Sequence, residues 1–163
     1  MKLTNRFYEL ELNEKNGSIC SLKNTKGKEF ICSNEQRNLV TLHMLDESGA
    51  KQQLQSNDAI FSYKSADGDI TILHYEKVGG MDIEVTAKVR CPQDDPMTYW
   101  SMNVKNHSDL HLDKIDFPKV VVPNDLVATG GTGRIFTSMM EGVVIEDVEI
   151  REHSWLHYRD IGY

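Results

Sequence analysis

The sequence predicts an all-β protein, organised as an antiparallel sandwich of two sheets. Two observations support this prediction: apolar residues recur at every second position in several segments, and turns rich in glycine, asparagine or proline separate these segments. About eight to ten strands are expected at this spacing. A third observation is that no segment has a convincing helical period, since the nearest candidate for a helix, residues 46–56, is short and polar.

The first predicted hairpin surrounds Gly17, which follows an alternating segment. A three-residue loop with Gly17 in the left-handed conformation would pair Leu12 with Cys20 and Leu10 with Leu22. A two-residue loop would instead place polar residues opposite these leucines. Because register follows burial, we expect the three-residue loop.

The second predicted hairpin surrounds Asp67-Gly68. Asp-Gly suits a two-residue type I′ turn, in which both central residues need positive φ. This loop would place Tyr63 opposite Ile72 and Phe61 opposite His74.

Further strands are expected where the alternation resumes. The clearest lies over residues 81–90, where every second residue is apolar and the others are polar, as in a strand with one buried face. Trp100 lies in a similar strand, and we therefore expect it in the core. The other predicted strands cover residues 37–45, 98–104 and 110–117, and one more begins near Arg134.

The alternation also suggests the domain organisation. We expect a β-sandwich domain over residues 1–125. Residues 126–163 would form the C-terminal part of the sandwich and the start of a linker to a downstream domain, because the alternation weakens there and glycines cluster at 130–133. The abrupt end at Tyr163 indicates a fragment of a longer protein.

Composition argues against several classes of function. The formal net charge is −7, and the 18 Lys and Arg residues form no dense cluster, so neither nucleic acid nor an anionic membrane is expected as a partner. The charge fits a neutral ligand or a protein. No segment is long and apolar enough for a membrane span, and no signal peptide is recognisable, so a cytoplasmic location is expected. The three cysteines, Cys20, Cys32 and Cys91, are expected to be reduced thiols.

No catalytic, cofactor-binding or metal-binding residue is predicted. His107 and His111 are four residues apart, as are His153 and His157, but on a strand such pairs lie about 13 Å apart. The glycines of residues 130–133 lack the lysine of a phosphate-binding loop, and no Gly-x-Ser-x-Gly elbow occurs. Acidic residues are abundant, but the sequence alone does not show which carboxylates face each other, as glycoside hydrolysis requires.

Aromatic residues near the C-terminus are the candidates for a contact surface. Trp155, His157 and Tyr158 lie in a polar segment, where they would contact a sugar or a neighbouring domain. Both interpretations remain open at this point.

Residues 8–31 have the order strand, Asn-Gly turn, Ile-x-x-Leu, polar turn with glycine, and Glu-Phe-Ile. This order resembles the first strands of β-supersandwich domains with the galactose-mutarotase-like fold. Residues 99–106, followed by Ile-Asp-Phe-Pro at 115–118, are similar to a later part of the same domains. The resemblance covers about residues 5–150. Such domains stand at the N-terminus of many bacterial glycoside hydrolases, ahead of a (β/α)8 catalytic barrel.

The resemblance implies a non-catalytic N-terminal domain of a carbohydrate-active enzyme, which braces the barrel and lines one side of the sugar cleft. Its partners would be the downstream catalytic domain and carbohydrate, without a cofactor, and the chain alone would hydrolyse no glycoside. A self-standing carbohydrate-binding or mutarotase-like module is one alternative. A structural interaction domain without sugar chemistry is another. Mutarotases use a histidine and a glutamate, but the resemblance assigns no such pair to this sequence.

Overall fold

The computed structural model describes residues 1–31 and 38–120, together with the backbone of two short strands at 134–137 and 143–146. The chain divides into two units, Met1–Val121 and Val122–Tyr163. The all-β prediction is confirmed: in the described residues the strands are all antiparallel, and helix is confined to two short 3₁₀ turns. The domain boundary at residue 125 stays a prediction.

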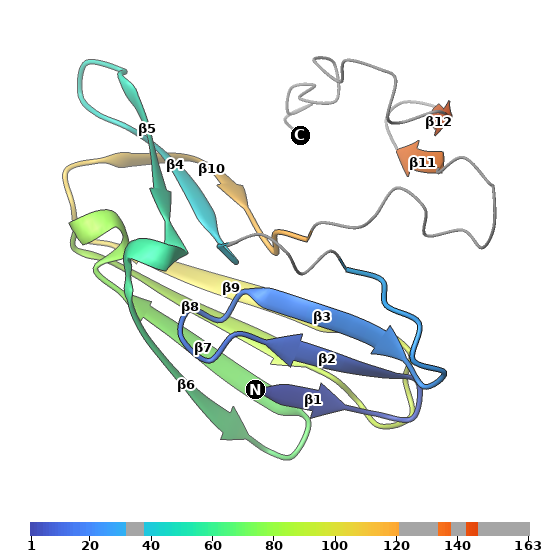
Figure 1. Ribbon diagram of the computed structural model, residues 1–163. Coiled ribbons are helices and arrows are strands. Elements are labelled where there is room, and N and C mark those ends of the chain that lie inside the picture. Colours follow the sequence, from blue (N-terminus) through green and yellow to red (C-terminus); the bar gives the residue numbers. More distant parts are fainter. Residues whose placement is uncertain (32–37, 121–133, 138–142, 147–163) are drawn as a thin grey trace. The chain divides into compact units, whose positions relative to one another are not determined.

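The first unit contains three sheets in its described residues (Figure 1). One has the order β1-β2-β3, from Lys2–Thr4, Tyr8–Leu12 and Ile19–Asn24. The largest has the order β6-β7-β8-β9, from Ile60–Ala66, Ile70–Glu76, Ile83–Arg90 and Tyr99–Asn106. The third has the order β10-β4-β5, from His111–Asp116, Thr41–Leu45 and Lys51–Gln55. The 3₁₀ turns are Ser56–Asp58 and Val78–Gly80.

The second unit contributes one described hairpin. Strand β11, Arg134–Thr137, pairs with β12, Val143–Glu146. The strand expected near Arg134 is therefore confirmed.

One hydrophobic core joins the three sheets of the first unit. It includes Leu10 and Leu12 from β2, Leu42 from β4, and Leu73 and Tyr75 from β7, each at most 2% exposed. Burial on this scale is the main favourable term in folding. Because β4, β5 and β10 form a further sheet beside the other two, the two-sheet sandwich stays a prediction.

Strand β8 shows most clearly how alternation builds this core. Ile83, Val85, Ala87 and Val89 have no exposed surface, and the residues between them face outwards, as predicted. The next strand, β9, directs alternate side chains to the same core. The segment that came nearest to a helix, residues 46–56, instead forms a turn and then β5, which pairs with β4.

The first hairpin differs from its predicted register by one residue near the turn. Leu10 pairs with Leu22, as expected. Leu12 pairs with Ile19, so the predicted pair of Leu12 with Cys20 is wrong. A bulge at this point buries Ile19 and leaves Cys20 half-buried, so the more apolar side chain takes the core position.

The second hairpin has a three-residue loop, and the predicted two-residue loop is wrong. Asp67 and Gly68 do have positive φ, at 45° and 61°, as Asp-Gly suggested. Asp69 also belongs to the loop, because Ala66 pairs with Ile70. The Asp69 carbonyl accepts a hydrogen bond of 2.9 Å from the Cys91 amide. This contact is made at the end of β8, far along the chain.

The longer loop shifts the whole register of β6 on β7. Phe61 pairs with Tyr75, and their rings lie 5.0 Å apart between centroids, whereas the prediction placed Phe61 opposite His74. Tyr63 pairs with Leu73 instead of Ile72. The observed register directs Phe61 to the buried tyrosine and leaves His74 on the outer side of the sheet.

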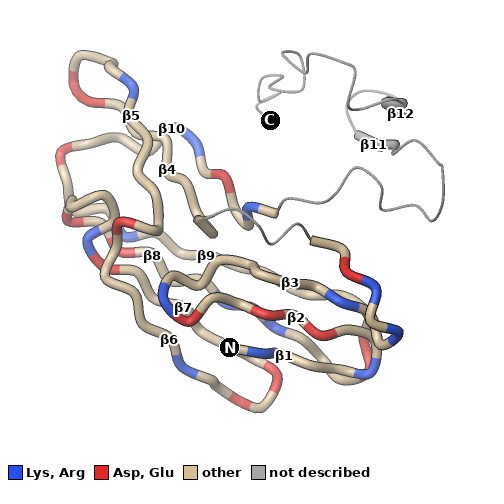
Figure 2. The backbone as a smooth tube through the Cα atoms, viewed as in Figure 1, with Lys and Arg blue, Asp and Glu red and all other residues tan. Residues whose placement is uncertain are grey.

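Lys, Arg, Asp and Glu residues are interspersed along the strands of the first unit (Figure 2). Among the described residues, none of the helices is long and apolar enough to cross a membrane.

Candidate functional site

The solvent side of the largest sheet is the most promising surface of the first unit. Successive residues of a strand point to opposite faces, so the neighbours of the buried residues on β7 and β8 point outwards. Register aligns them in rows across the strands. We call this surface the outer face; its central residues are Ser62, Lys64, Ile72, His74, Thr86, Lys88, Ser101 and Asn103.

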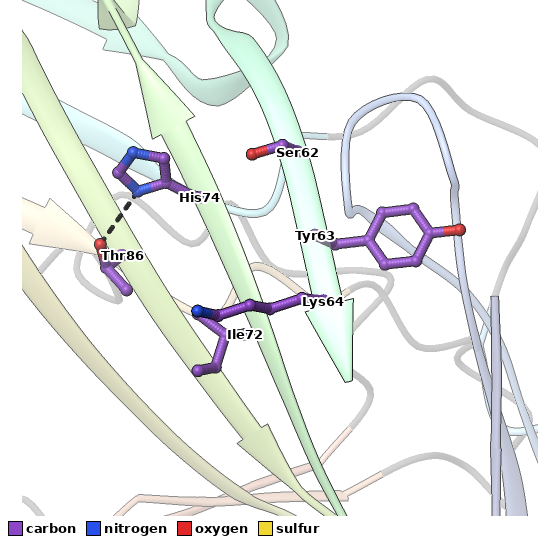
Figure 3. Close-up of a pocket in the computed structure, with 6 residues that line it drawn as sticks. All are labelled: Ser62, Tyr63, Lys64, Ile72, His74 and Thr86. Carbon is purple, nitrogen blue, oxygen red and sulfur yellow. Dashed lines mark hydrogen bonds between the residues drawn. The ribbon is translucent and has the colours of Figure 1, made fainter. Parts of the chain in front are cut away.

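A depression of about 430 Å³ lies on this face over β6, β7 and β8. Its lining residues are Ser62, Tyr63, Lys64, Ile72, His74 and Thr86. In Figure 3 the Lys64 side chain extends towards Ile72, and the Tyr63 ring points away from the other side chains. The volume falls in the range of small-molecule sites, and hydroxyl, imidazole and ammonium groups surround an isoleucine.

His74 is held on both sides of its ring. Its Nδ1 lies 3.1 Å from the Thr86 hydroxyl oxygen, and its Nε2 lies 3.3 Å from a carboxylate oxygen of Glu76. The side chain is about one-third exposed. These contacts fix the ring orientation, so His74 presents a defined edge to the depression.

An aromatic side chain borders the same face at the start of β9. The Tyr99 hydroxyl donates a hydrogen bond of 2.6 Å to Asp95, and the Arg90 guanidinium lies 5.4 Å from the ring centroid. The bond to Asp95 raises the pKa of Tyr99, and the same bond lowers the pKa of Asp95. Arg90 also reaches Asp69 at 3.3 Å, so this tyrosine is fixed although 48% of its surface is exposed.

A second polar cluster lies on the sheet formed by β10, β4 and β5. His43 Nε2 is 2.8 Å from Asp116 Oδ2, and Lys114 Nζ is 3.1 Å from the other carboxylate oxygen. Burial disfavours the charge of Asp116, but the hydrogen bonds from His43 and Lys114 outweigh it and lower its pKa. This cluster links the neighbouring strands β4 and β10.

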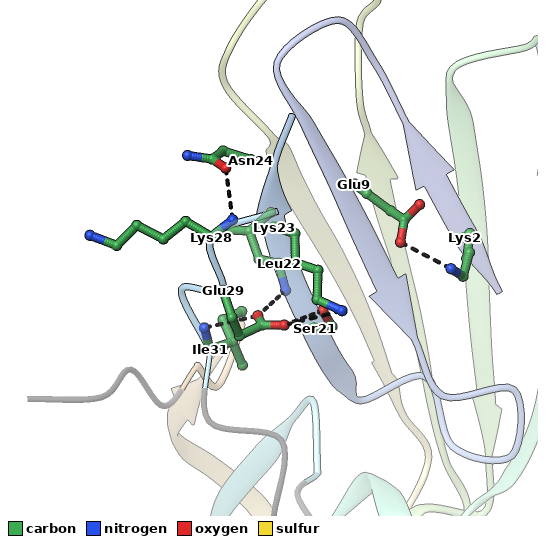
Figure 4. Close-up of polar contacts among 9 residues, drawn as sticks. All are labelled: Lys2, Glu9, Ser21, Leu22, Lys23, Asn24, Lys28, Glu29 and Ile31. Carbon is green, nitrogen blue, oxygen red and sulfur yellow. Dashed lines mark hydrogen bonds and ion pairs between the residues drawn. The ribbon is translucent and has the colours of Figure 1, made fainter. Parts of the chain in front are cut away.

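A third cluster fixes the loop after β3 (Figure 4). The Glu29 carboxylate accepts hydrogen bonds from the Ser21 hydroxyl at 2.6 Å, the Leu22 amide at 2.8 Å and the Ile31 amide at 3.2 Å. Lys23 Nζ lies 3.8 Å away. Burial opposes the charge, but these contacts lower the pKa of Glu29. Two of these bonds hold the loop against β3 and the third lies within the loop, so this cluster serves the fold.

The residues predicted as contacts have different outcomes. Trp155, His157 and Tyr158 lie outside the described residues, so their role stays a prediction. Trp100 packs against the core cluster, with its ring edge-on to Phe117 at 6.0 Å, as expected. The described residues contain no group of three side chains that could hold a metal ion.

Sequence reasoning did not identify the depression. Its residues are individually common surface types, and they become neighbours through the register of three strands. With the predicted two-residue loop, His74 would lie opposite Phe61, and Ser62 and His74 would not be cross-strand neighbours as they are in the structure.

Comparison with models of known protein families finds no match, and no curated protein matches the chain. The resemblance to β-supersandwich domains therefore stays a prediction.

Proposed function

We propose that this chain is the non-catalytic β-domain of a carbohydrate-active enzyme, and that its outer face contacts sugar beside a catalytic domain. The observation that carries the proposal is the depression around His74, where hydrogen-bonding side chains from three strands surround Ile72. The resemblance of residues 8–31 to the first strands of supersandwich domains supports the same conclusion.

The chemistry of the depression suits a sugar ring. A pyranose has an apolar face of C–H groups and a rim of hydroxyls. Ile72 offers an apolar contact for the ring face, and Ser62 and Thr86 offer hydroxyls to its rim. A rigid antiparallel sheet holds these groups in place before a ligand arrives, which reduces the entropy lost on binding.

The geometry of His74 favours binding over turnover. A general acid and a general base that act on one sugar must reach different atoms of it. His74 and Glu76 instead contact each other at 3.3 Å, two residues apart on one strand. Both side chains would therefore contact a ligand from the same side. We propose accordingly that the isolated chain neither hydrolyses glycosides nor interconverts sugar anomers.

The resemblance also supplies the proposed partner, a (β/α)8 catalytic barrel in the same protein. In this arrangement the β-domain braces the barrel, and Trp155, His157 and Tyr158 are the proposed contacts with sugar or with that barrel. The mutarotase-like alternative differs in one measurable respect, because it requires turnover by the chain itself.

The test is a titration of the isotope-labelled chain with a panel of methyl glycosides, followed by amide chemical shifts. We expect weak binding, on the order of millimolar, because an open depression contacts one side of a ligand. The shifts should map to β6, β7 and β8, and His74→Ala should weaken binding about tenfold. His111→Ala, on a different sheet, is the matched control.

Two results would contradict the proposal. One is the absence of saccharide binding to the outer face. The other is glycoside hydrolysis or mutarotation that a single substitution in this chain abolishes, which would promote the mutarotase-like alternative.

A further inference from the structure

Among the described residues of the outer face, the acidic side chains have ion-pair partners, but some of the basic side chains do not. Several carboxylates on or beside this face have a basic side chain within 3.4 Å, and Asp95 at its border accepts a hydrogen bond from Tyr99. The pairs are Glu76 with His74, Glu84 with Lys105, and Asp69 with Arg90. The acidic groups next to the depression are thus already engaged.

Two lysines on the same face have no such partner. Lys64 is the cross-strand neighbour of Ile72 on one side, and Lys88 is its neighbour on the other. Both are exposed, and within the part of the chain that the structure describes neither makes an ion pair. Their positions are two strand spacings apart, about 10 Å, with Ile72 between them.

This spacing suits one anionic group placed over the isoleucine. Lysine stems are long and flexible, so both ammonium groups can turn towards a shared carboxylate. Hydrogen bonds between an ammonium and a carboxylate are charge-assisted and stronger than neutral ones. An anion between the two lysines would also relieve their mutual repulsion.

We propose that the depression binds a saccharide that carries a carboxylate, such as a uronic acid. Lys64 and Lys88 hold the carboxylate. The Ser62 and Thr86 hydroxyls bond the hydroxyls of the ring, which lies beside the fixed imidazole of His74. This inference rests on the proposed function and narrows its substrate class. It replaces the neutral ligand expected from the net charge of −7. The net charge describes the whole chain, whereas binding depends on the charges beside the depression, where, in the described part of the chain, the acidic groups are paired and the two lysines are not.

The experiment compares a uronic acid with its own methyl ester, which has the same ring and no charge. Calorimetric or chemical-shift titrations would use methyl glucuronoside, methyl galacturonoside, their esters, and acetate as a bare carboxylate. We expect each acid to bind about tenfold more tightly than its ester, and added salt to reduce this difference.

Lysine variants locate the effect. Lys64→Gln and Lys88→Gln should each weaken uronate binding several-fold and leave ester binding unchanged. Lys51→Gln, an exposed lysine on β5, is the matched control and should change neither affinity. Circular dichroism spectra that match the unsubstituted chain would show that the variants fold.

The outcomes separate the two proposals. Equal affinities for acid and ester, with no effect of the lysine variants, would overturn this inference and leave the proposed sugar contact standing. Acetate binding as tightly as the uronates would also overturn it, because the site would then recognise an anion without a sugar. If neither acid nor ester binds the outer face, both proposals fail.

Discussion

The hydroxyl of Tyr75 donates a hydrogen bond of 3.1 Å to the backbone carbonyl of Asn16. Tyr75 lies near the C-terminal end of β7, and Asn16 lies in the loop between β2 and β3, so the bond joins two sheets. Burial raises the pKa of Tyr75, since the ring is fully enclosed and its charged form would lose hydration. The bond therefore anchors the first hairpin against the largest sheet through a neutral group.

Gly17 follows Asn16 and is the position where a substitution should most disturb the hydrogen bond between Tyr75 and Asn16. Its φ is +70°, which confirms the left-handed conformation predicted from the sequence. A Cβ here would clash with the Tyr75 hydroxyl and come within 2.9 Å of Phe61. Gly17→Ala should therefore cost more than the backbone penalty alone, about 2 kcal/mol or more.

The matched control is Gly68→Ala, where φ is +61° and a Cβ meets nothing within 4 Å, so about 1 kcal/mol is expected. Denaturant unfolding of both variants measures the difference, and equal losses would contradict the packing at Gly17.

Phe61 and Tyr63 test the register of the second hairpin. Phe61 is half-buried against Tyr75, whereas 43% of the Tyr63 surface is exposed. Phe61→Ala should cost about 2–3 kcal/mol, because it removes apolar contacts with the core. Tyr63→Ala should cost less than about 1 kcal/mol. Thermal or denaturant unfolding checks the order. Small losses for both variants would indicate the register with the two-residue loop, which would turn Phe61 and Tyr63 together to the outer face.

The sequence predicts strands well where one face is fully buried. In β8 every inward position must be apolar and every outward position can be polar, so the alternation is unambiguous. Strand β5 carries the sequence Lys-Gln-Gln-Leu-Gln, and Leu54 is its one buried residue. Strand β5 is held in the sheet by backbone pairing with β4. Backbone pairing leaves no alternation of apolar residues in the sequence.

Hairpin register was harder to predict because distant contacts set the loop lengths. The Asp-Gly pair has the expected backbone conformation, yet Asp69 is a third loop residue, and its carbonyl accepts a hydrogen bond from the distant Cys91 amide. Near the first turn, burial of Ile19 outweighs the simpler pairing of Leu12 with Cys20. Each error is a single residue, but such a shift changes which side chains are neighbours, and the depression on the outer face depends on those neighbours.

Glu29 should make stability depend on pH. Its pKa is lower in the folded chain than the ordinary value of 4.5, so the folded state binds this proton less tightly than the unfolded state. The stabilisation is therefore fully present above about pH 4.5 and is lost as pH falls through the folded pKa. At pH 7, Glu29→Ala should cost about 1–2 kcal/mol, because the Leu22 and Ile31 amides lose their acceptor while water replaces part of the contact.

The measurement is denaturant unfolding of the unsubstituted chain and of Glu29→Ala between pH 3 and pH 7. The difference between the two should shrink towards acid pH. Glu47→Ala, at an exposed position in the turn before β5, is the control. A difference that stays constant with pH would show that the carboxylate of Glu29 does not act through its charge.

Asn5 connects the N-terminal strands to the loop that precedes β9. Its Nδ2 donates hydrogen bonds to the carbonyls of Pro92 at 2.9 Å and Asp95 at 3.0 Å. Its Oδ1 accepts from the amides of Phe7 and Tyr8, and the side chain is buried. One amide group thus satisfies four backbone groups, and it holds the loop whose Asp95 carboxylate fixes the ring of Tyr99.

Two substitutions separate the donor role of Asn5 from its acceptor role. Asn5→Ala should cost about 2–3 kcal/mol, since it leaves buried backbone groups without partners. Asn5→Asp keeps the acceptor but directs a carboxylate at two carbonyl oxygens, so its charged form is disfavoured and the pKa of the new carboxyl should rise on folding. Because this pKa is higher in the folded state, the aspartate variant should be destabilised least, relative to the unsubstituted chain, at acid pH. Its loss in free energy of unfolding should grow as pH rises. Unfolding at pH 4 and pH 7 measures this trend.

Asn57→Asp, exposed and an acceptor from Asn16, is the control, and its deficit should change less between the two pH values. A pH-independent deficit for Asn5→Asp would show that the two carbonyls do not face this side chain.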